Sequence, residues 1–300
     1  MSKLLLRRRN LLIRKQEEEM NIRAVCFKAD GEQTVELVKH NYTSSKVFQY
    51  SYDGVIWESW DMSPLPFGGQ TKVYVRGYNK TLGWDLSTYT NFVFGTDAYV
   101  YVSGIVESLL DGDNEVLTYG TNGILRQLFY QQTALRSVEN LRFEAISTSY
   151  NAVAVYAYMF YGCTNLLYAP KVLSITSFRG GYEYAGMFKD CKSLVKAPEL
   201  PGTDLYGFVY QNMFDSCISL VDAPCLPAKT LAQGCYRLMF NNCSNIKSLK
   251  CHAKVNATDA TNRWLNGVTT SGTLYGHAEY GWSFGVSGIP TTWTFEELTD

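Results

Sequence analysis

One phrase, Met-Phe-x-x-Cys-x-x-Leu, recurs through the second half of this chain. It begins at Met159, Met187 and Met213, and a copy with Ile in place of Leu begins at Met239, so that successive copies are 28, 26 and 26 residues apart. Three of the copies are followed by Ala-Pro. A unit of this length cannot bury its own apolar side, so the copies are expected to stack on one another as a solenoid.

Stacking would place each repeat position in a file along the array. The sequence therefore predicts that Phe160, Phe188, Phe214 and Phe240 lie in single file. The cysteines of the phrase also hold one fixed position, and a buried free Cys behaves as a small apolar residue. A row of sulfur atoms suits neither the dihedral angle of a disulfide nor the tetrahedron of a zinc site. We expect reduced, buried thiols at Cys163, Cys191, Cys217 and Cys243.

Composition excludes some classes of protein. The formal net charge of −1 is too low for the concentrated basic surface that nucleic-acid binding requires. No segment reaches the ~18 apolar residues of a membrane span. The basic opening segment lacks the continuous apolar core of a secretory signal, which predicts that the protein is made and kept on the cytoplasmic side.

Four regions can be distinguished along the chain. Residues 1–21 are predicted to be a helical docking segment, because helix formers predominate there. Residues 22–114 alternate apolar and polar residues between Gly-rich turns, which predicts a small antiparallel β-sandwich. Residues 115–255 hold the repeats, and residues 256–300, with their Trp and Gly residues, are predicted to be a C-terminal cap. The predicted fold class is α+β and mostly β: an N-terminal helix, a small sandwich, and a leucine-rich-repeat solenoid with a cap.

The repeat unit, with its Ala-Pro-x-Leu-Pro continuation, resembles the BspA-like leucine-rich repeat. Members of that family occur in surface proteins of gut bacteria and in proteins of their phages. The segment from Tyr52-Asp53-Gly54 to Val73-Tyr74-Val75 resembles the β module that often precedes such repeats, and the Leu-rich, Arg-rich opening resembles that of phage structural proteins. The resemblance implies recognition of proteins, glycans or cell surfaces rather than catalysis.

A search for catalytic motifs finds little. His40, His252 and His277 each fall in a different segment, and none has a partner at the spacing of a metal-binding helix. Phosphate-binding and nucleophile-elbow motifs are absent from the sequence. We therefore expect no catalytic residues, no metal and no cofactor.

Candidate binding residues come from positions that differ between repeats. They flank the fixed apolar positions or lie in the loops between repeats, and a mixed polar and aromatic strip of this kind suits a glycan or a protein. The candidates are Tyr168, Lys171, Tyr182, Tyr184, Lys196, Glu199, Tyr206 and Asp222. For docking to other virion proteins the candidates are Leu4, Leu5, Arg8, Leu11 and Leu12.

These observations favour a non-enzymatic phage structural or adhesion protein, of the fibre or decoration type, located in the virion and made in the host cytoplasm. Its expected partners are other virion proteins and a host-surface protein or glycan, and a homo-oligomer is left open. The first alternative is a bacterial cell-surface repeat adhesin. A glycan-processing enzyme is the third hypothesis, which the lack of a plausible acid–base pair disfavours.

Overall fold

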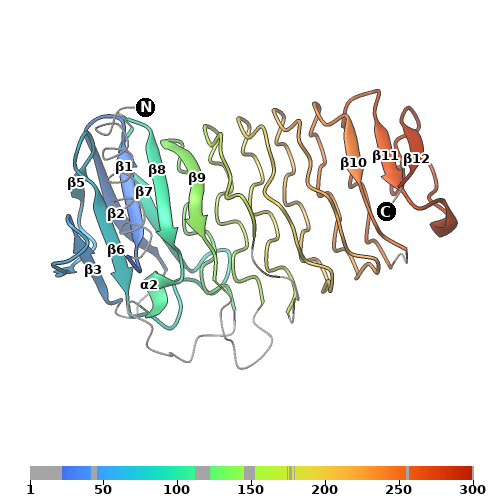
Figure 1. Ribbon diagram of the computed structural model, residues 1–300. Helices are drawn as coiled ribbons and strands as arrows, with labels where there is room; N and C mark the ends of the chain where they lie inside the picture. The colour runs from blue at the N-terminus through green and yellow to red at the C-terminus, as the bar shows by residue number, and fades with distance from the viewer. Residues whose placement is uncertain are drawn as a thin grey trace, which may run out of the picture.

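The protein is elongated, with β-sheets at one end and a row of stacked turns leading to the other (Figure 1). The computed structural model describes residues 22–41, 46–96, 98–111, 122–144, 153–173, 175, 178, 180–254 and 257–298. The predicted helical docking segment, with Leu4, Leu5, Arg8, Leu11 and Leu12, lies outside the described residues.

Two sheets form the N-terminal end. The larger, six-stranded sheet has the order β4-β3-β6-β1-β8-β9, and the smaller, three-stranded sheet has the order β5-β2-β7. The strands of the larger sheet are β1 (Val25–Ala29), β3 (Phe48–Ser51), β4 (Glu58–Trp60), β6 (Val73–Gly77), β8 (Val100–Ile105) and β9 (Leu135–Arg142). Those of the smaller sheet are β2 (Gln33–His40), β5 (Leu65–Phe67) and β7 (Tyr89–Phe94). Neighbouring strands are antiparallel except for β8 and β9, which are parallel.

Alternation of side chains explains how the sheets pack. In β1 the side chains of Val25 and Phe27 are fully buried, and the Phe27 ring lies 4.8 Å from the ring of Phe92 on β7. Because successive side chains of a strand point to opposite faces, Cys26 and Lys28 lie on the outer face of the larger sheet.

The described residues between 122 and 268, here called the repeat stack, form series of tight turns rather than helices. Residues of positive φ recur every fourth position within each copy, as at Ala154, Tyr158 and Gly162. In the turn Tyr156–Met159 the N–H of Met159 donates to the carbonyl of Tyr156 at 3.3 Å, and Tyr158 takes the third position, where a type II turn requires positive φ. We call each copy of this turn series a rung.

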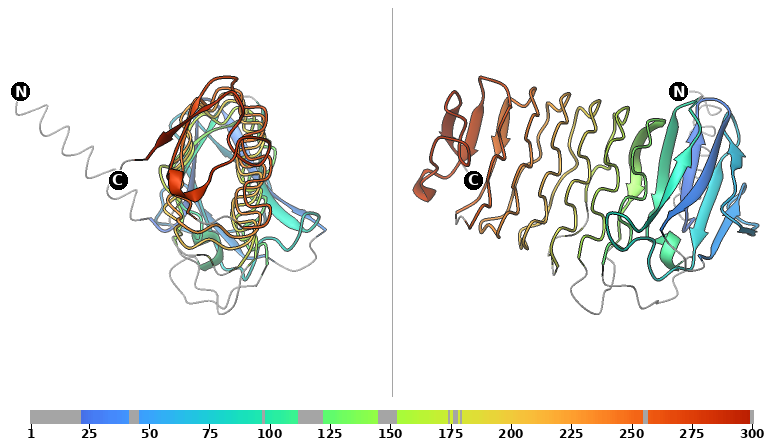
Figure 2. Two further views of the ribbon diagram at one scale, coloured as in Figure 1. Left: turned by 90° about the vertical axis from the view of Figure 1, so that its right-hand side faces the viewer. Right: turned by 180° about the vertical axis from the view of Figure 1, so that it is seen from behind.

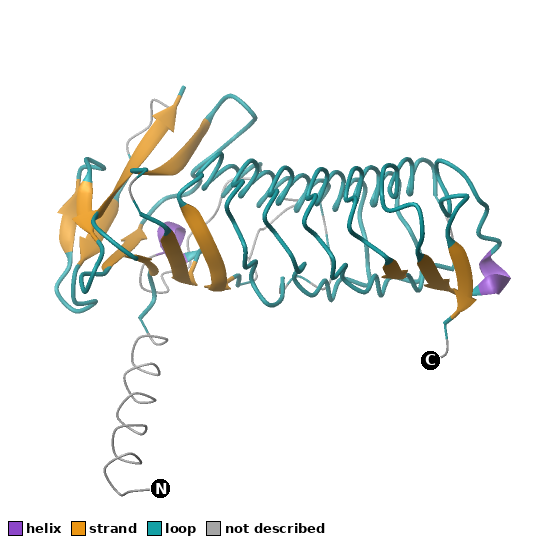
Figure 3. Ribbon diagram, turned by 90° about the horizontal axis from the view of Figure 1, so that it is seen from above, coloured by secondary structure: helices purple, strands orange, loops and turns teal. Residues whose placement is uncertain are grey.

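Successive rungs are joined by main-chain hydrogen bonds. The N–H of Tyr156 donates to the carbonyl of Glu183 at 2.9 Å, and the N–H of Phe160 donates to that of Met187 at 2.9 Å. The N–H of Tyr158 likewise donates to the carbonyl of Ala185 at 2.9 Å, whereas the N–H groups of Ala157 and Met159 close turns within their own rung. When the repeat stack is viewed along its long axis, the turns of successive rungs overlie one another on one side of the molecule (Figure 2, left). Figure 3 shows the same turns as a continuous row.

The predicted single file of phenylalanines is confirmed. Neighbouring rings lie 5.3 to 5.6 Å apart from Phe160 to Phe240 and are nearly parallel. The file extends through Phe129 to Phe92 of β7 at 5.4 Å per step, so one apolar core runs from the sheets into the repeat stack. A second file of rings is buried from Tyr156 to Trp264 and ends at the partly buried Trp282. It contains Tyr156, Tyr184, Tyr210, Tyr236, Trp264 and Trp282, with ring centroids 5.4 to 6.4 Å apart.

The cysteines of the repeat phrase are free and fully buried, as predicted. Their role is more specific than that of a small apolar residue. The Cys191 thiol donates to the carbonyl of Phe160 at 3.1 Å, and the other three thiols make the same bond to the preceding phenylalanine at 2.9 to 3.0 Å. Each cysteine therefore ties its rung to the one before it.

The C-terminal end is closed by a small parallel sheet and an irregular loop. Strands β10 (Ser248–Lys250), β11 (Thr273–Gly276) and β12 (Thr294–Glu297) pair in that order, and a 3-10 turn, Ala278–Tyr280, follows β11. The loop 283–289 supplies carbonyl oxygens to the last rung: Arg263 N–H donates to Val286 at 3.1 Å and the Trp264 indole donates to Gly288 at 2.7 Å.

The predicted fold class is wrong. The described chain is nearly all β, and its longest helix is the four-residue α2 (Ser108–Asp111). The sheets also do not form a solenoid, since strand pairing between rungs is limited to isolated parallel bridges such as Tyr168 with Lys196. Prolines in the Ala-Pro-x-Leu-Pro segments remove ladder donors, which keeps the strands from extending.

Candidate functional site

The predicted binding residues on the connecting segments come together in part. Isolated parallel bridges join Ser137 to Tyr168, Tyr168 to Lys196 and Lys196 to Asp222. Because parallel partners are neighbours on the same face, Tyr168, Lys196 and Asp222 form a row across the rungs, and all three are exposed. The interior files keep aromatic rings, Phe in one and Tyr or Trp in the other, whereas this row changes its residue at every rung.

Two further candidates lie beside that row. Lys171 and Glu199 are exposed, and the N–H of Glu199 donates to the carbonyl of Lys171 at 2.8 Å. The ammonium group of Lys171 lies 3.8 Å from the Glu139 carboxylate at the end of β9, a solvent-exposed ion pair of little energetic weight. The structure thus gathers five of the predicted residues on one surface.

The other three candidates lie elsewhere. Tyr184 is wholly buried in the second ring file, between Tyr156 and Tyr210, so it does not belong to an exposed surface. Its position two residues after a positive-φ residue points it inward, which a loop assignment could not reveal. Tyr182 stacks on Phe208 at 4.9 Å, and Tyr206 is exposed in the connection between rungs.

The row continues into the N-terminal sheet, which sequence reasoning missed. Lys28 of β1 pairs with Tyr101 of β8, and Tyr101 pairs with Ser137 of β9. The full sequence of neighbours is therefore Lys28, Tyr101, Ser137, Tyr168, Lys196 and Asp222, which we call the outer row. The sequence signal that could have identified Tyr101 is the alternation of residues 99–102. This alternation places Tyr101 on the sheet face opposite the core residues Val100 and Val102.

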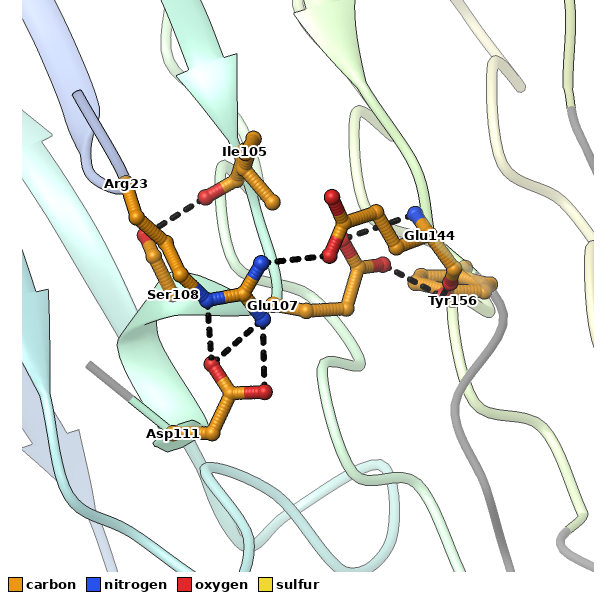
Figure 4. Close-up of polar contacts among 7 residues, drawn as sticks. All are labelled: Arg23, Ile105, Glu107, Ser108, Asp111, Glu144 and Tyr156. Carbon is orange, nitrogen blue, oxygen red and sulfur yellow. Dashed lines mark hydrogen bonds and ion pairs between the residues drawn. The ribbon is translucent and has the colours of Figure 1, made fainter. Parts of the chain in front are cut away.

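A second polar group lies where the sheets meet the repeat stack (Figure 4). This junction cluster consists of Arg23, Glu107, Asp111, Glu144 and Tyr156. The Arg23 guanidinium donates to both Asp111 oxygens at 2.6 and 2.7 Å and also reaches the Glu144 carboxylate. Hydrogen bonding to these two carboxylates outweighs the effect of burial and raises the pKa of Arg23.

Glu107 is the buried member of that cluster. One of its oxygens accepts the Tyr156 hydroxyl at 2.6 Å and the other accepts the Glu144 N–H at 2.9 Å. Burial raises the pKa of Glu107 to about 8, although both hydrogen bonds act in the opposite direction. The Tyr156 hydroxyl also lies 3.2 Å from the Glu144 carbonyl oxygen. It can therefore donate either to Glu107 or to this carbonyl without movement of the heavy atoms.

A cavity of about 660 Å³ lies next to this cluster on the outer face of the larger sheet. Small residues in and next to β1 and β8, such as Ala24, Cys26 and Ser103, line it, and so does Glu144 of the junction cluster. Lys28, Glu139 and Lys171 also line it, which connects the cavity to the outer row.

The described residues hold no cluster of three or more His, Cys, Asp or Glu side chains that could bind a metal ion. His252 and His277, which the sequence places far apart, have ring centroids 5.8 Å apart, with Glu297 3.7 Å from His277. No helix in the described part of the chain is long and apolar enough to cross a membrane. No family model, no curated protein and no solved structure matches this chain.

Proposed function

We propose that the protein is a non-enzymatic structural or adhesion component of a phage particle, of the fibre or decoration type, which binds a host-surface protein or glycan through the outer row. The observation that carries the proposal is the contrast between interior and surface. The interior repeats Phe, Tyr and Cys from rung to rung, while Tyr168, Lys196 and Asp222 hold one structural position with three different chemistries.

A non-catalytic role is supported by the state of the buried acid. Glu107 has the raised pKa of a candidate general acid, but both of its oxygens already have protein partners. Its side chain is buried, and its carboxyl group lies between Tyr156 and Glu144 (Figure 4). A general acid must reach the leaving group of its substrate, and this arrangement instead suits a lock between the sheets and the repeat stack.

The N-terminal segment is proposed to fix the protein to the particle, and a virion location follows from that attachment. Its support is compositional: two short apolar runs, which contain Leu4, Leu5, Leu11 and Leu12, lie on either side of a basic run that includes Arg8. A chain that begins at residue 22 should keep its melting temperature but fail to enter particles. Normal incorporation of the shortened chain would contradict the attachment role.

The binding role is tested with cells. Fluorescently labelled full-length protein should bind the surface of some members of a panel of bacteria, and Lys196→Glu should reduce that binding at least threefold. A change at the remote exposed ring, Tyr206→Ala, is the matched control and should have no effect. The alternative, a bacterial surface adhesin, predicts instead that the protein is found on the cells that encode it.

A further inference from the structure

A row that contains two small side chains crosses the outer face of the larger sheet. Strand pairing places Tyr74, Cys26, Ser103 and Asn140 side by side, from β6 through β1 and β8 to β9. In β1 and β8 this row lies two residues from the outer row, and residues two apart on a strand share a face. Because Cys26 and Ser103 are small, the sheet face is recessed between Tyr74 and the strand β9, which lies beside β8 in Figure 1.

The recess belongs to the cavity of about 660 Å³ described above. Apolar side chains of different exposure line this cavity: Leu141 and Phe143 are 2% and 3% exposed, whereas Val172 of the neighbouring connecting segment is 41% exposed. A volume of this size is within the range of sites that enclose small organic groups, about 300–1,000 Å³. The cavity therefore has room for a large apolar side chain.

The charged side chains that line the cavity already interact with other groups of the protein. They are Lys28, Glu139, Arg142, Glu144 and Lys171. Glu144 is paired with Arg23, and the Lys171 ammonium lies 3.8 Å from the Glu139 carboxylate. A charged ligand would have to compete with these partners, whereas a neutral group would leave them in place. The cavity therefore suits an uncharged ligand.

The lining suits an apolar side chain better than a sugar. Apart from the phenol of Tyr74, the uncharged polar side chains of the described lining are Ser103 and Asn140. A sugar carries several hydroxyl groups that need hydrogen-bond partners once they leave water. Its rings also stack on exposed aromatic faces, but Tyr74 and Phe143 are only 5% and 3% exposed. An apolar side chain needs neither kind of contact.

The surroundings of the cavity have the composition of a protein interface. Lys28, Glu139 and Lys171 line the cavity, and Lys196 and Asp222 of the outer row continue the mixture of charges. Protein interfaces commonly combine an apolar pocket with a polar rim that excludes water from it. A protein surface carries both signs of charge and can therefore complement this rim.

We propose that the cavity receives one large apolar side chain, of the leucine, phenylalanine or tryptophan type, from a protein on the host surface, and that the outer row forms the polar rim of this contact. The apolar side chain supplies affinity because it leaves water for a lining that includes Leu141, Phe143 and Val172. The charges of the rim orient the partner. This inference rests on the proposed recognition function and assigns its ligand to proteins rather than glycans.

The class of partner is tested on bacteria that bind the labelled full-length protein. Treatment of the cells with proteinase K should reduce binding at least tenfold, a difference of about 1.4 kcal/mol in apparent affinity. Oxidation of the surface glycans with periodate should leave binding within about threefold of that to untreated cells. Loss of binding after periodate, or binding that survives proteinase K, would overturn the proposal.

Two substitutions act on the cavity itself. Val172→Asp adds a charge to its lining and Ser103→Phe fills it, and each should weaken cell binding at least tenfold. Ile218→Asp is the matched control, because Ile218 is exposed to a similar extent but lies outside the lining, and it should leave binding unchanged. Melting temperatures establish that the variants are folded, and Val172→Asp, at an exposed position, serves if Ser103→Phe is not.

Blocked amino acids test the cavity without cells. Saturation-transfer difference NMR on the full-length protein should detect N-acetyl-tryptophanamide and N-acetyl-leucinamide but not N-acetyl-glutaminamide, and Ser103→Phe should remove the signal. The chain that begins at residue 22 should give the same result. A signal seen only with this shortened chain would show that the N-terminal segment of the protein itself occupies the cavity, which would overturn the proposal.

The remaining outcomes separate this inference from the recognition function. If light scattering shows an oligomer that Val172→Asp dissociates, a second copy of the chain occupies the cavity and the inference fails. If cell binding is sensitive to Lys196→Glu but not to Val172→Asp, the recognition function stands and the cavity has no part in it. If the protein binds no cells, both proposals fail.

Discussion

At the scale of single residues, the stack is specified by a few polar atoms in an apolar interior. The sequence correctly indicated that the repeat cysteines are buried and reduced. It could not reveal their hydrogen bonds, because the acceptor of the Cys191 thiol is a carbonyl 31 residues away along the chain. That contact depends on the spacing between rungs, which no local pattern encodes.

Replacement of one such cysteine tests the tie between rungs. Cys191→Ala loses the bond to the Phe160 carbonyl and leaves a small void, so we expect a loss of about 1–3 kcal/mol in the free energy of unfolding. Cys191→Ser retains a donor at that position and should lose less than Cys191→Ala. Chemical denaturation monitored by fluorescence measures both, and equal losses would show that the thiol acts only by filling space.

The pKa of Glu107 predicts how stability depends on pH. Because the folded-state pKa of about 8 exceeds the ordinary value of 4.5, the folded protein retains a proton that the unfolded chain loses. Stability from this group is complete below pH 4.5 and falls between pH 4.5 and 8, by up to about 1.4 kcal/mol per pH unit. Glu183, whose pKa burial raises to about 7, should add a similar decline between pH 4.5 and 7.

Glu107→Gln isolates the contribution of that carboxyl. The amide can donate to the Tyr156 oxygen and accept the Glu144 N–H, as the neutral acid does. The variant should match the wild type at pH 5 and be more stable at pH 8, as measured by thermal unfolding at both values. A constant difference between the two proteins across this range would contradict ionisation of Glu107 as the cause.

At the scale of elements, the rung is a series of turns whose backbone conformation the sequence only partly displays. Gly162 and Gly186 occupy positive-φ positions, as glycine commonly does, but Tyr158 and Leu238 occupy equivalent ones. No propensity favours an aromatic or branched residue there. Stacking on neighbouring rungs imposes the conformation, which the sequence of a single repeat does not display.

Two glycine substitutions separate the stability lost through steric clash at such a position from the stability lost through backbone strain. Gly186 and Gly69 share a φ of +59°, but an added methyl group would clash with the Tyr158 ring at Gly186 and meet nothing within 4 Å at Gly69. We expect Gly69→Ala to cost about 1–2 kcal/mol through strain alone. Gly186→Ala should cost clearly more, and equal costs in denaturant unfolding would show that the rungs yield to accommodate the methyl group.

Removal of the hydroxyl group from two tyrosines of the buried file should change the stability in opposite directions. The Tyr156 hydroxyl bonds Glu107, whereas that of Tyr236 is buried without a hydrogen-bond partner among the described residues. Removal of an unsatisfied buried hydroxyl recovers its desolvation cost, so Tyr236→Phe should stabilise the protein by about 1 kcal/mol. Tyr156→Phe should destabilise it by about 1–3 kcal/mol, and a loss at both sites in thermal unfolding would contradict the assignment.

At the scale of the whole molecule, the sheets and the repeat stack share one core. Phe129 lies 5.4 Å from Phe92 of the sheets and 5.4 Å from Phe160 of the stack. The wild-type protein should therefore unfold in a single calorimetric transition. Phe129→Ala should cost about 3–5 kcal/mol and broaden or split that transition, whereas Phe240→Ala, near the other end of the file, should lower its temperature without splitting it.

The sequence indicated the stacking of the repeats and the alternation of the strands, because both follow from local periodicity. It did not indicate that β9 joins the larger sheet in parallel with β8, because residues 106–134 separate the two strands along the chain. The candidate site was affected in the same way. Tyr168 and Lys196 were identified from the repeats, but Tyr101 and Lys28 enter the outer row only through that pairing.

The hydrogen bonds between rungs on the turn side give the stack a direction. Each N–H that leaves a rung points toward the C-terminal end, from Tyr156 to Glu183 and finally from Arg263 to Val286. The two ends of the array are thus chemically unlike, one rich in acceptors and the other in donors. The loop 283–289 already accepts the N–H of Arg263 in the last rung. A duplicated repeat added after this loop would therefore find no free N–H donors to bind, whereas a repeat inserted between two existing rungs would.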